Sequence, residues 1–318
     1  MITQLAFVFP GQGSQSVGML SDLAEQYPSI AETFAEASEG AGADLWHISQ
    51  NNPDDQLNQT EFTQPALLAA NIALWRLWQA QGGAQPAILC GHSLGEYAAL
   101  VAAGALSLKD GAHLVRQRGQ FMQAAVPAGV GAMAAVLGAE DALVEQVCGQ
   151  VSQDNAMVVP ANFNSPGQIV IGGHAVAVDR AIEALQAQGI RKIVKLPVSV
   201  PSHTPLMREA AERLRTAIES ITWRMPDYAV IHNVDARAKY SIAEIQQALV
   251  EQLYLPVQWT QCTQALAAAG VRHAVECGPG KVLAGLVKRI DKSVSTYNLS
   301  TPADWQATLE QTFSLGQL

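Results

Sequence analysis

Hydrophobic residues in this chain form short, uninterrupted runs, and longer stretches with helical periodicity separate these runs. Residues 5–9 and 87–90 are two such runs, and neither alternates apolar with polar positions. A strand that is apolar on both faces is typical of a parallel sheet covered by helices. Pro10 ends the first run. The pattern therefore predicts an α/β protein with a buried, mainly parallel sheet.

The pattern changes in the middle of the chain, where several short predicted strands follow one another closely. We expect strands at 132–137, 157–162, 168–171 and 192–196, with helices at 141–151 and 176–188. This βαββαβ order is that of a ferredoxin-like unit. Turn-forming residues at 164–167 would join its middle strands. We therefore expect a small subdomain, residues 128–200, inserted in a large one made of residues 1–127 and 201–318.

Helical periodicity dominates the rest of the large subdomain. We expect helices at 29–38, 66–78, 108–125, 206–221, 242–253, 260–269 and 282–290, and further strands at 229–233, 273–276 and 293–299. Pro65 precedes the second of these helices and suits its first turn.

Composition excludes several classes of protein. The net charge of −9 gives no cationic field for nucleic acid. No apolar stretch could span a bilayer and no signal peptide is visible, so we expect a cytoplasmic protein without membrane attachment. The four cysteines are scattered without metal-ligand spacing, which suits a reducing compartment and argues against a metal site.

The sequence Gly-His-Ser-Leu-Gly at 91–95 lies between a predicted strand and a predicted helix. This is the context of a nucleophile elbow, in which Ser93 occupies a strained turn and the flanking glycines let strand and helix approach closely. Because Leu94 begins the helix, its backbone N–H is unpaired and is a candidate oxyanion donor.

A serine nucleophile needs a base. Of the seven histidines, His203 is the best placed, because Pro201 and Pro205 hold it in a stiff segment at the junction of the subdomains. No acidic residue stands out as its partner; Asp227 and Asp235 fit only loosely, so a backbone or amide carbonyl is an alternative.

Arg118 has apolar residues three and four positions away on both sides, so it lies within the buried stripe of its helix. A buried guanidinium needs an anion. That anion could be a ligand or a structural acid, or the side chain could instead reach the surface.

The loop that begins Gly11-Gln12-Gly13 follows the first strand, at the edge where α/β sheets bind ligands. It superficially matches a dinucleotide fingerprint, and a nucleotide-dependent oxidoreductase would rest on it. Ser16 occupies the third glycine position, which disfavours that function.

Seven stretches together resemble the malonyl-CoA:acyl-carrier-protein transacylase family. They are Phe-Pro-Gly-Gln-Gly-Ser-Gln at 9–15, Gly-His-Ser-Leu-Gly-Glu-Tyr at 91–97, Arg-Gly at 118–119, Asn-Phe-Asn-Ser-Pro-Gly-Gln at 162–168, Ser-Val-Pro-Ser-His at 199–203, Gln-Leu at 252–253 with Pro-Val-Gln-Trp at 256–259, and Gly-Pro-Gly at 278–280. The resemblance covers nearly the whole chain. It implies an α/β-hydrolase-like large subdomain with a ferredoxin-like small one.

The resemblance also implies roles for individual residues. Ser93 would be the nucleophile, His203 the base, and the backbone N–H groups of Gln12 and Leu94 the oxyanion hole. Arg118 would bind the malonyl carboxylate. The main-chain carbonyl of Gln252 would orient the imidazole, and Asn162 would lie near the substrate.

The implied reaction is ping-pong transfer of malonyl from malonyl-CoA to the phosphopantetheine thiol of acyl carrier protein, without another cofactor. We expect a monomer acting in fatty acid biosynthesis. The alternatives are a trans-acting polyketide acyltransferase, a serine thioesterase or hydrolase, and a carrier-docking module without catalysis. Because such carriers are acidic, we expect docking at Lys192, Lys288 and Arg289, although a solvated helix face is the simpler interpretation of these charges.

Overall fold

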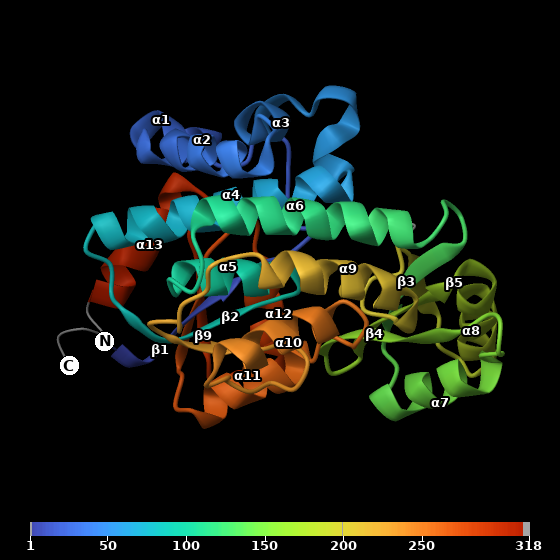
Figure 1. Cartoon of the computed structure of the whole chain (residues 1–318). Helices are drawn as coiled ribbons and strands as arrows, with labels where there is room; N and C mark the ends of the chain where they lie inside the picture. The colour runs from blue at the N-terminus through green and yellow to red at the C-terminus, as the bar shows by residue number, and fades with distance from the viewer. Residues whose placement is uncertain (1, 199, 314–318) are drawn as a thin grey trace.

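The structure is a computed structural model, and it describes residues 2–198 and 200–313 (Figure 1). A five-stranded sheet with strand order β7-β2-β1-β8-β9 lies at its centre, and all of its strand pairs are parallel. The strands are β1 (Ile2–Phe9), β2 (Pro86–Gly91), β7 (Ala229–Ile231), β8 (His273–Glu276) and β9 (Ser295–Asn298). Phe9 pairs with Gly91 at the carboxyl ends of β1 and β2. The loops that follow these two strands therefore start side by side.

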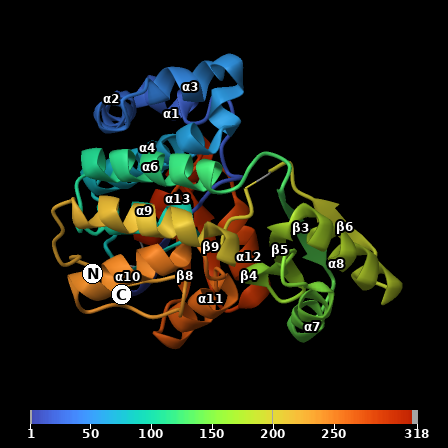
Figure 2. The same cartoon turned by 45° about the vertical axis from the view of Figure 1, so that its right-hand side comes forward.

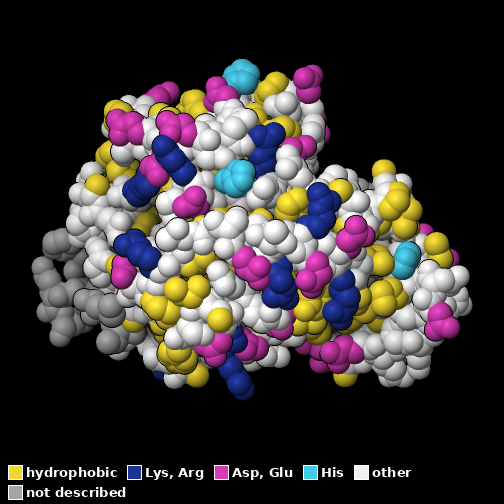
Figure 3. Space-filling view, viewed as in Figure 1, with side chains coloured by type: hydrophobic (Ala, Val, Ile, Leu, Met, Phe, Trp, Pro, Cys, Tyr) yellow, Lys and Arg dark blue, Asp and Glu magenta, His cyan; other side chains and the backbone are white. Residues whose placement is uncertain are grey.

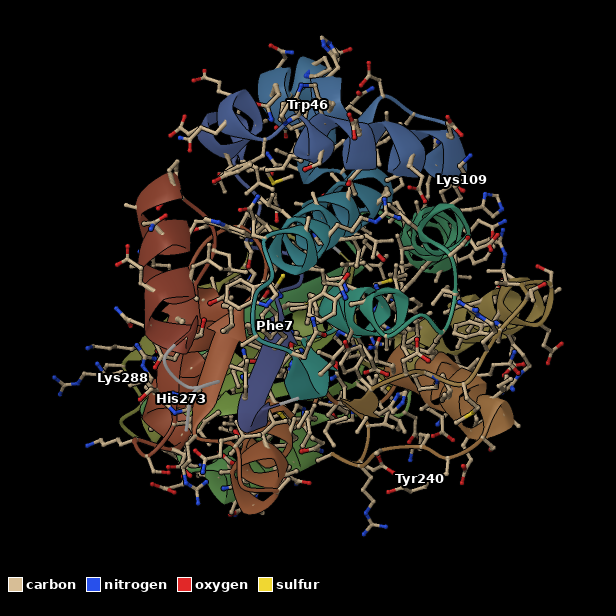
Figure 4. The ribbon with its side chains drawn as sticks, turned by 90° about the vertical axis from the view of Figure 1, so that its left-hand side faces the viewer. Phe7, Trp46, Lys109, Tyr240, His273 and Lys288 are labelled. Atoms are coloured by element: carbon tan, nitrogen blue, oxygen red, sulfur yellow. The ribbon has the colours of Figure 1, made fainter. Side chains whose placement is uncertain are left out.

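Strand β1 is buried on both faces, which explains its lack of alternation. Leu5, Phe7 and Phe9 belong to the larger hydrophobic core, whereas Ala6 and Val8 belong to a second core on the opposite face. The larger core also includes Trp75, and the centroids of the Trp75 and Phe7 rings lie 5.2 Å apart. Figure 4 shows Phe7 deep between the helices. The prediction of a covered parallel sheet is confirmed.

Helices enclose this sheet in layers. In Figure 1, α1, α2 and α3 form an upper layer over α4 and α6, while α11 and α12 lie on the opposite side of the sheet. The helices of the large sheet are α1 (Ser21–Gln26), α2 (Ser29–Ala41), α3 (Leu45–Asn51), α4 (Thr60–Ala80), α5 (Leu94–Ala102), α6 (Leu108–Ala125), α9 (Arg208–Glu219), α10 (Ile242–Gln252), α11 (Trp259–Ala268), α12 (Val282–Ile290) and α13 (Pro302–Phe313), with 3₁₀ turns η1 (Pro53–Asn58) and η2 (Pro205–Met207). No helix of the described part of the chain is long and apolar enough to cross a bilayer.

A second, antiparallel sheet stands to one side of the first (Figure 2). Its strands are β3 (Gly131–Leu137), β4 (Val158–Ser165), β5 (Gln168–His174) and β6 (Lys192–Lys195), in the order β4-β5-β3-β6. Helices α7 (Asp141–Val151) and α8 (Ala175–Ala187) cover one face. This is the ferredoxin-like arrangement that the sequence predicts. The other face carries Met133 and Val170, which line a cavity described below.

Two local predictions are wrong. Pro65 lies inside α4 rather than in its first turn, because the helix begins earlier, at Thr60. The turn between β4 and β5 is shorter than expected, since Ser165 still pairs with Gln168 and only two residues remain between them. Asn164 is therefore a strand residue, and its side chain becomes available to the site.

Candidate active site

The turn at Ser93 has the geometry of a nucleophile elbow. Ser93 has φ 51° and ψ −110°, outside the ordinary regions for a non-glycine residue. A Cβ on Gly91 would lie 1.9 Å from the backbone of Gly95, and one on Gly95 would lie 1.9 Å from the carbonyl oxygen of Phe9. Both glycines are thus required for the contact between β2, α5 and β1. The predicted strain and close approach are confirmed.

Ser93 and His203 are in direct contact. The hydroxyl Oγ of Ser93 lies 2.8 Å from Nε2 of His203, and Nδ1 of His203 lies 2.6 Å from the main-chain oxygen of Gln252. Because a carbonyl oxygen only accepts hydrogen bonds, Nδ1 carries the proton and Nε2 is free to accept one from the serine. Asp227 and Asp235 are elsewhere: Asp227 lies beside Gly104, and Asp235 pairs with Lys239.

The His203 imidazole is electrostatically biased toward its neutral form. Burial, and then the nearby positive charge of Arg118, lower its pKa from 6.5 to about 3. The His203 side chain is 3% exposed, and its backbone N–H donates to the carbonyl of Leu253. A neutral imidazole is the form that can remove a proton from serine.

Arg118 lies beside this pair on α6 and is 1% exposed. Its Nη1 donates to Oε1 of Gln64 at 2.7 Å, and its Nη2 donates to Oε1 of Gln252 at 2.9 Å and to Oγ of Ser93 at 3.3 Å. The guanidinium lies over the ring of Tyr97, 5.4 Å from its centroid. Among the described residues, no carboxylate forms an ion pair with Arg118. Of the three explanations that the sequence leaves open, surface exposure and an ion pair with a structural acid are thus excluded.

A buried hydrogen-bond network, which the sequence did not predict, holds the backbone of the elbow in position. Glu96 is fully buried and accepts hydrogen bonds from Nδ1 of His232, from the backbone N–H of Asn233 and from Nε2 of Gln252. The side chain of Asn233 in turn accepts from the backbone N–H of Ser93 at 2.7 Å. The one sequence signal was an acidic residue within the apolar run of α5.

The loop after β1 lies against the elbow. A Cβ on Gly11 would lie 2.4 Å from the carbonyl oxygen of His92, so the next residue, Gln12, lies close to the turn. Gln12 lies in a turn and Leu94 is the first residue of α5, and neither backbone N–H donates a hydrogen bond to another described residue. Both residues, with Ser93, border the same cavity, so their N–H groups are available to a ligand.

This cavity, of about 620 Å³, lies between the two sheets. The segments after β1 and β2 contribute Gln12 and the elbow, α6 contributes Arg118, and the small sheet contributes Met133, Asn162 and Val170. Nε2 of His92 lies 2.7 Å from Oδ1 of Asn164, which joins the elbow to β4 across the cavity wall. Asn162 is 6% exposed and forms a bridge with Val257. The structure thus brings together all the predicted site residues of the pocket.

The predicted docking residues lie away from the cavity floor, and their side chains are exposed. Lys288 and Arg289 are in the last turn of α12, and Lys192 begins β6. Nη1 of Arg289 donates to Oε1 of Gln168 at 2.7 Å, which links α12 to the small sheet.

Comparison with known proteins gives one consistent answer. The family model of the acyl transferase domain matches residues 6–304. The chain is 52% identical over 310 residues to the malonyl CoA-acyl carrier protein transacylase of Salmonella typhimurium, with 98% of this chain and all of that protein covered. It is 66% identical to the malonyl-CoA:acyl carrier protein transacylase of Xanthomonas oryzae, whose crystal structure has a TM-score of 0.96 with 98% of each chain covered.

A further solved structure is a complex. It contains the malonyl-transacylase PlMCAT bound to AntF, a type II PKS acyl-carrier protein. It has a TM-score of 0.95 and 47% identity, with 97% of this chain and 99% of that chain covered. By its family match, its identity to these relatives and its fold, the chain belongs to the malonyl-CoA:acyl-carrier-protein transacylase family of acyltransferases.

Proposed function

We propose that this chain transfers a malonyl group from malonyl-CoA to the phosphopantetheine thiol of an acyl carrier protein, through an ester on Ser93. The observation that carries the proposal is the position of one hydroxyl. Ser93 Oγ lies 2.8 Å from the imidazole of His203 and 3.3 Å from the guanidinium of Arg118, at the edge of one cavity. A nucleophile, a neutral base and a cation for a carboxylate therefore meet where a malonyl thioester would react.

In the first half-reaction, Ser93 Oγ attacks the thioester carbonyl while Nε2 of His203 takes the hydroxyl proton. The oxyanion receives hydrogen bonds from the backbone N–H groups of Gln12 and Leu94. Collapse of the intermediate breaks the C–S bond, and His203 returns the proton to the sulfur of CoA. In the second half-reaction, the carrier thiol gives its proton to His203 and attacks the ester carbonyl. The ester C–O bond to Ser93 then breaks, and His203 returns the proton to Oγ of Ser93.

Arg118 would bind the free carboxylate of the malonyl group through charge-assisted hydrogen bonds. Asn162, at the cavity wall, would contact the bound substrate. The carbonyl of Gln252 would hold the imidazole in the reactive tautomer throughout, so that a neutral acceptor replaces the usual acid. The two thiols, side chains and backbone amides supply all of this chemistry, so the mechanism uses no metal or additional cofactor.

Intact-protein mass spectrometry tests the proposal. The wild-type protein mixed with malonyl-CoA should gain the mass of one malonyl group, and the carrier thiol should remove it. The Ser93→Ala variant should gain none, whereas Ser202→Ala, which removes another hydroxyl at the cavity, serves as the matched control. A wild-type protein that forms no adduct would exclude the mechanism, and rapid loss of the adduct to water would indicate a hydrolase.

We also propose how the chain is organised around this reaction. Residues 128–200 form the small subdomain and residues 1–127 and 201–318 the large one, with the cavity between them. The carrier docks on Lys288, Arg289 and Lys192, whose exposed cations would face its acidic surface. The enzyme acts as a cytoplasmic monomer in fatty acid biosynthesis. A competition between fatty-acid and polyketide carriers for the malonyl-enzyme tests the pathway.

A further inference from the structure

Within the described part of the chain, the guanidinium of Arg118 has only neutral partners. Its hydrogen-bond acceptors are two carboxamide oxygens and one hydroxyl, from Gln64, Gln252 and Ser93. The ring beneath it belongs to Tyr97, and burial raises the pKa of this phenol, so it carries no charge. A cation that is 1% exposed and lacks a counterion is costly, because its desolvation is not offset by an opposite charge.

The site contains one buried carboxylate, on Glu96, but that group is kept from Arg118. Its oxygens accept hydrogen bonds from His232, from Asn233 and from Nε2 of Gln252. The carboxamide of Gln252 lies between the two charges, since its oxygen accepts from Arg118 while its nitrogen donates to Glu96. The cation and the anion are therefore linked through an amide and are not paired directly.

Gln64 is the other neutral acceptor, and among the described residues its side chain forms no hydrogen bond with Ser93 or His203. Its Oε1 lies 2.7 Å from Nη1 of Arg118, and its Nε2 contacts Sδ of Met122 at 3.6 Å. The Gln64 side chain is 1% exposed, on α4. A glutamate here would have nearly the same shape, but it would place a carboxylate in hydrogen-bond contact with the guanidinium.

We infer that Gln64 determines acyl specificity by being uncharged: it holds the guanidinium in position and leaves its charge to the carboxylate of the substrate. The inference rests on the proposed role of Arg118. Selectivity for a carboxylated acyl group over a neutral one then requires an uncharged side chain, and not an acid, at position 64. A carboxylate at position 64 would compete with the carboxylate of the substrate for the guanidinium of Arg118.

The test compares malonyl-CoA with acetyl-CoA as donors. We expect Gln64→Glu to lower kcat/KM for malonyl-CoA by roughly 10- to 100-fold relative to acetyl-CoA, because the substrate must displace an internal carboxylate. We also expect a higher Tm without ligand and a smaller increase of Tm on adding malonyl-CoA. Gln79→Glu, the same change at an exposed position of α4, should leave the malonyl-to-acetyl ratio unchanged. A wild-type ratio in Gln64→Glu overturns the inference.

Two further variants keep the result interpretable. Gln64→Met, which introduces no charge, should retain the malonyl preference even if Gln64→Glu does not fold. If Gln64→Met instead loses the preference as fully as Arg118→Ala, then Gln64 acts by positioning alone and the inference is wrong. If Arg118→Ala itself keeps the preference, the proposed function of Arg118 fails. If Arg118→Ala loses it while Gln64→Glu keeps it, only the inference about Gln64 fails.

Discussion

At the scale of single residues, the charge of Arg118 and the protonation of His203 are coupled. Burial, and secondly Arg118, hold the pKa of His203 at about 3, below its ordinary value of 6.5. Between these two values the unfolded chain binds a proton that the folded chain does not. This histidine therefore lowers the free energy of unfolding as the pH falls from about 6.5 to about 3, and it contributes no pH dependence above that window.

Removing the charge of Arg118 should raise the pKa of His203. In Arg118→Met the desolvation remains but the electrostatic repulsion is lost, so the pKa should move up toward 6.5 without reaching it. Nitrogen NMR of the imidazole ring across pH 4–8 measures this directly, and a His203→Ala spectrum identifies the signal. The wild-type ring should remain neutral at pH 5. An unchanged midpoint in the variant would show that burial alone sets the pKa.

The sequence was informative about residues that carry unusual chemistry and uninformative about those that support them. Ser93 and Arg118 stand out, because one lies between two glycines and the other is a cation in an apolar stripe. Gln64 does not stand out, and Glu96 does so only as an acid within an apolar run, since the importance of both depends on which buried groups they meet across the fold. The partners in such three-dimensional contacts cannot be read from a local pattern.

At the scale of elements, the elbow depends on glycines at which three segments meet. In Gly95→Ala the new Cβ would overlap the carbonyl oxygen of Phe9, so β1 and α5 must separate. We expect a loss of about 1–3 kcal/mol or more in the free energy of unfolding, since a tightly packed backbone has little freedom to relax. Acylation of Ser93 should slow by roughly 100-fold, because displacement of a nucleophile by about 1 Å has effects of that size.

Gly285→Ala is the matched control. Gly285 is also in a helix, α12, but a Cβ there meets nothing within 4 Å. Alanine should therefore stabilise the protein by about 0.5–1 kcal/mol through helix propensity and leave acylation unchanged. Urea unfolding and malonyl-enzyme formation measure both effects. Equal stability of the two variants would contradict the importance of the close approach.

Elements with a clear periodic pattern were predicted well, and their ends less so. Helices α6 (Leu108–Ala125) and α7 (Asp141–Val151) have the bounds that their apolar spacing predicts. Helix α4 begins six residues before the predicted start at residue 66, because a proline within the first turns of a helix loses only one backbone hydrogen bond. Helix α13 was not predicted. Its Trp305 packs against Trp78 in the larger core, and a contact between residues so far apart in the chain is not visible in the sequence pattern.

At the scale of the whole molecule, the cavity beside Ser93 forms only where the two sheets and their loops meet. The subdomain order could be predicted from the succession of strands and helices. The cavity could not, because its walls come from segments far apart in the chain that meet through contacts such as His92 with Asn164. The view in Figure 3 shows basic side chains interspersed with acidic ones. If an acidic carrier docks through charge, local basic clusters would have to provide the contacts, because no face of one sign is seen in this view.

The net charge of −9 provides a test that separates local docking from general repulsion. Lys288→Glu and Lys109→Glu both change the net charge from −9 to −11, since each replaces one positive charge by one negative charge. Lys288 and Lys109 are well separated in Figure 4, and Lys109 pairs with Glu39 on the surface. If α12 is the docking site, only Lys288→Glu should raise the KM for carrier protein, by roughly threefold to tenfold as for one interfacial charge pair.

The KM for malonyl-CoA should remain at its wild-type value in both variants, because neither lysine borders the cavity. Steady-state kinetics with the carrier varied at saturating malonyl-CoA, and then the reverse, measures the two constants separately. The effect of Lys288→Glu on the carrier should shrink as salt is added, since exposed charges are screened over about 8–10 Å near physiological ionic strength. Equal increases in both variants would show that overall repulsion, and not a docking surface on α12, controls encounter with the carrier.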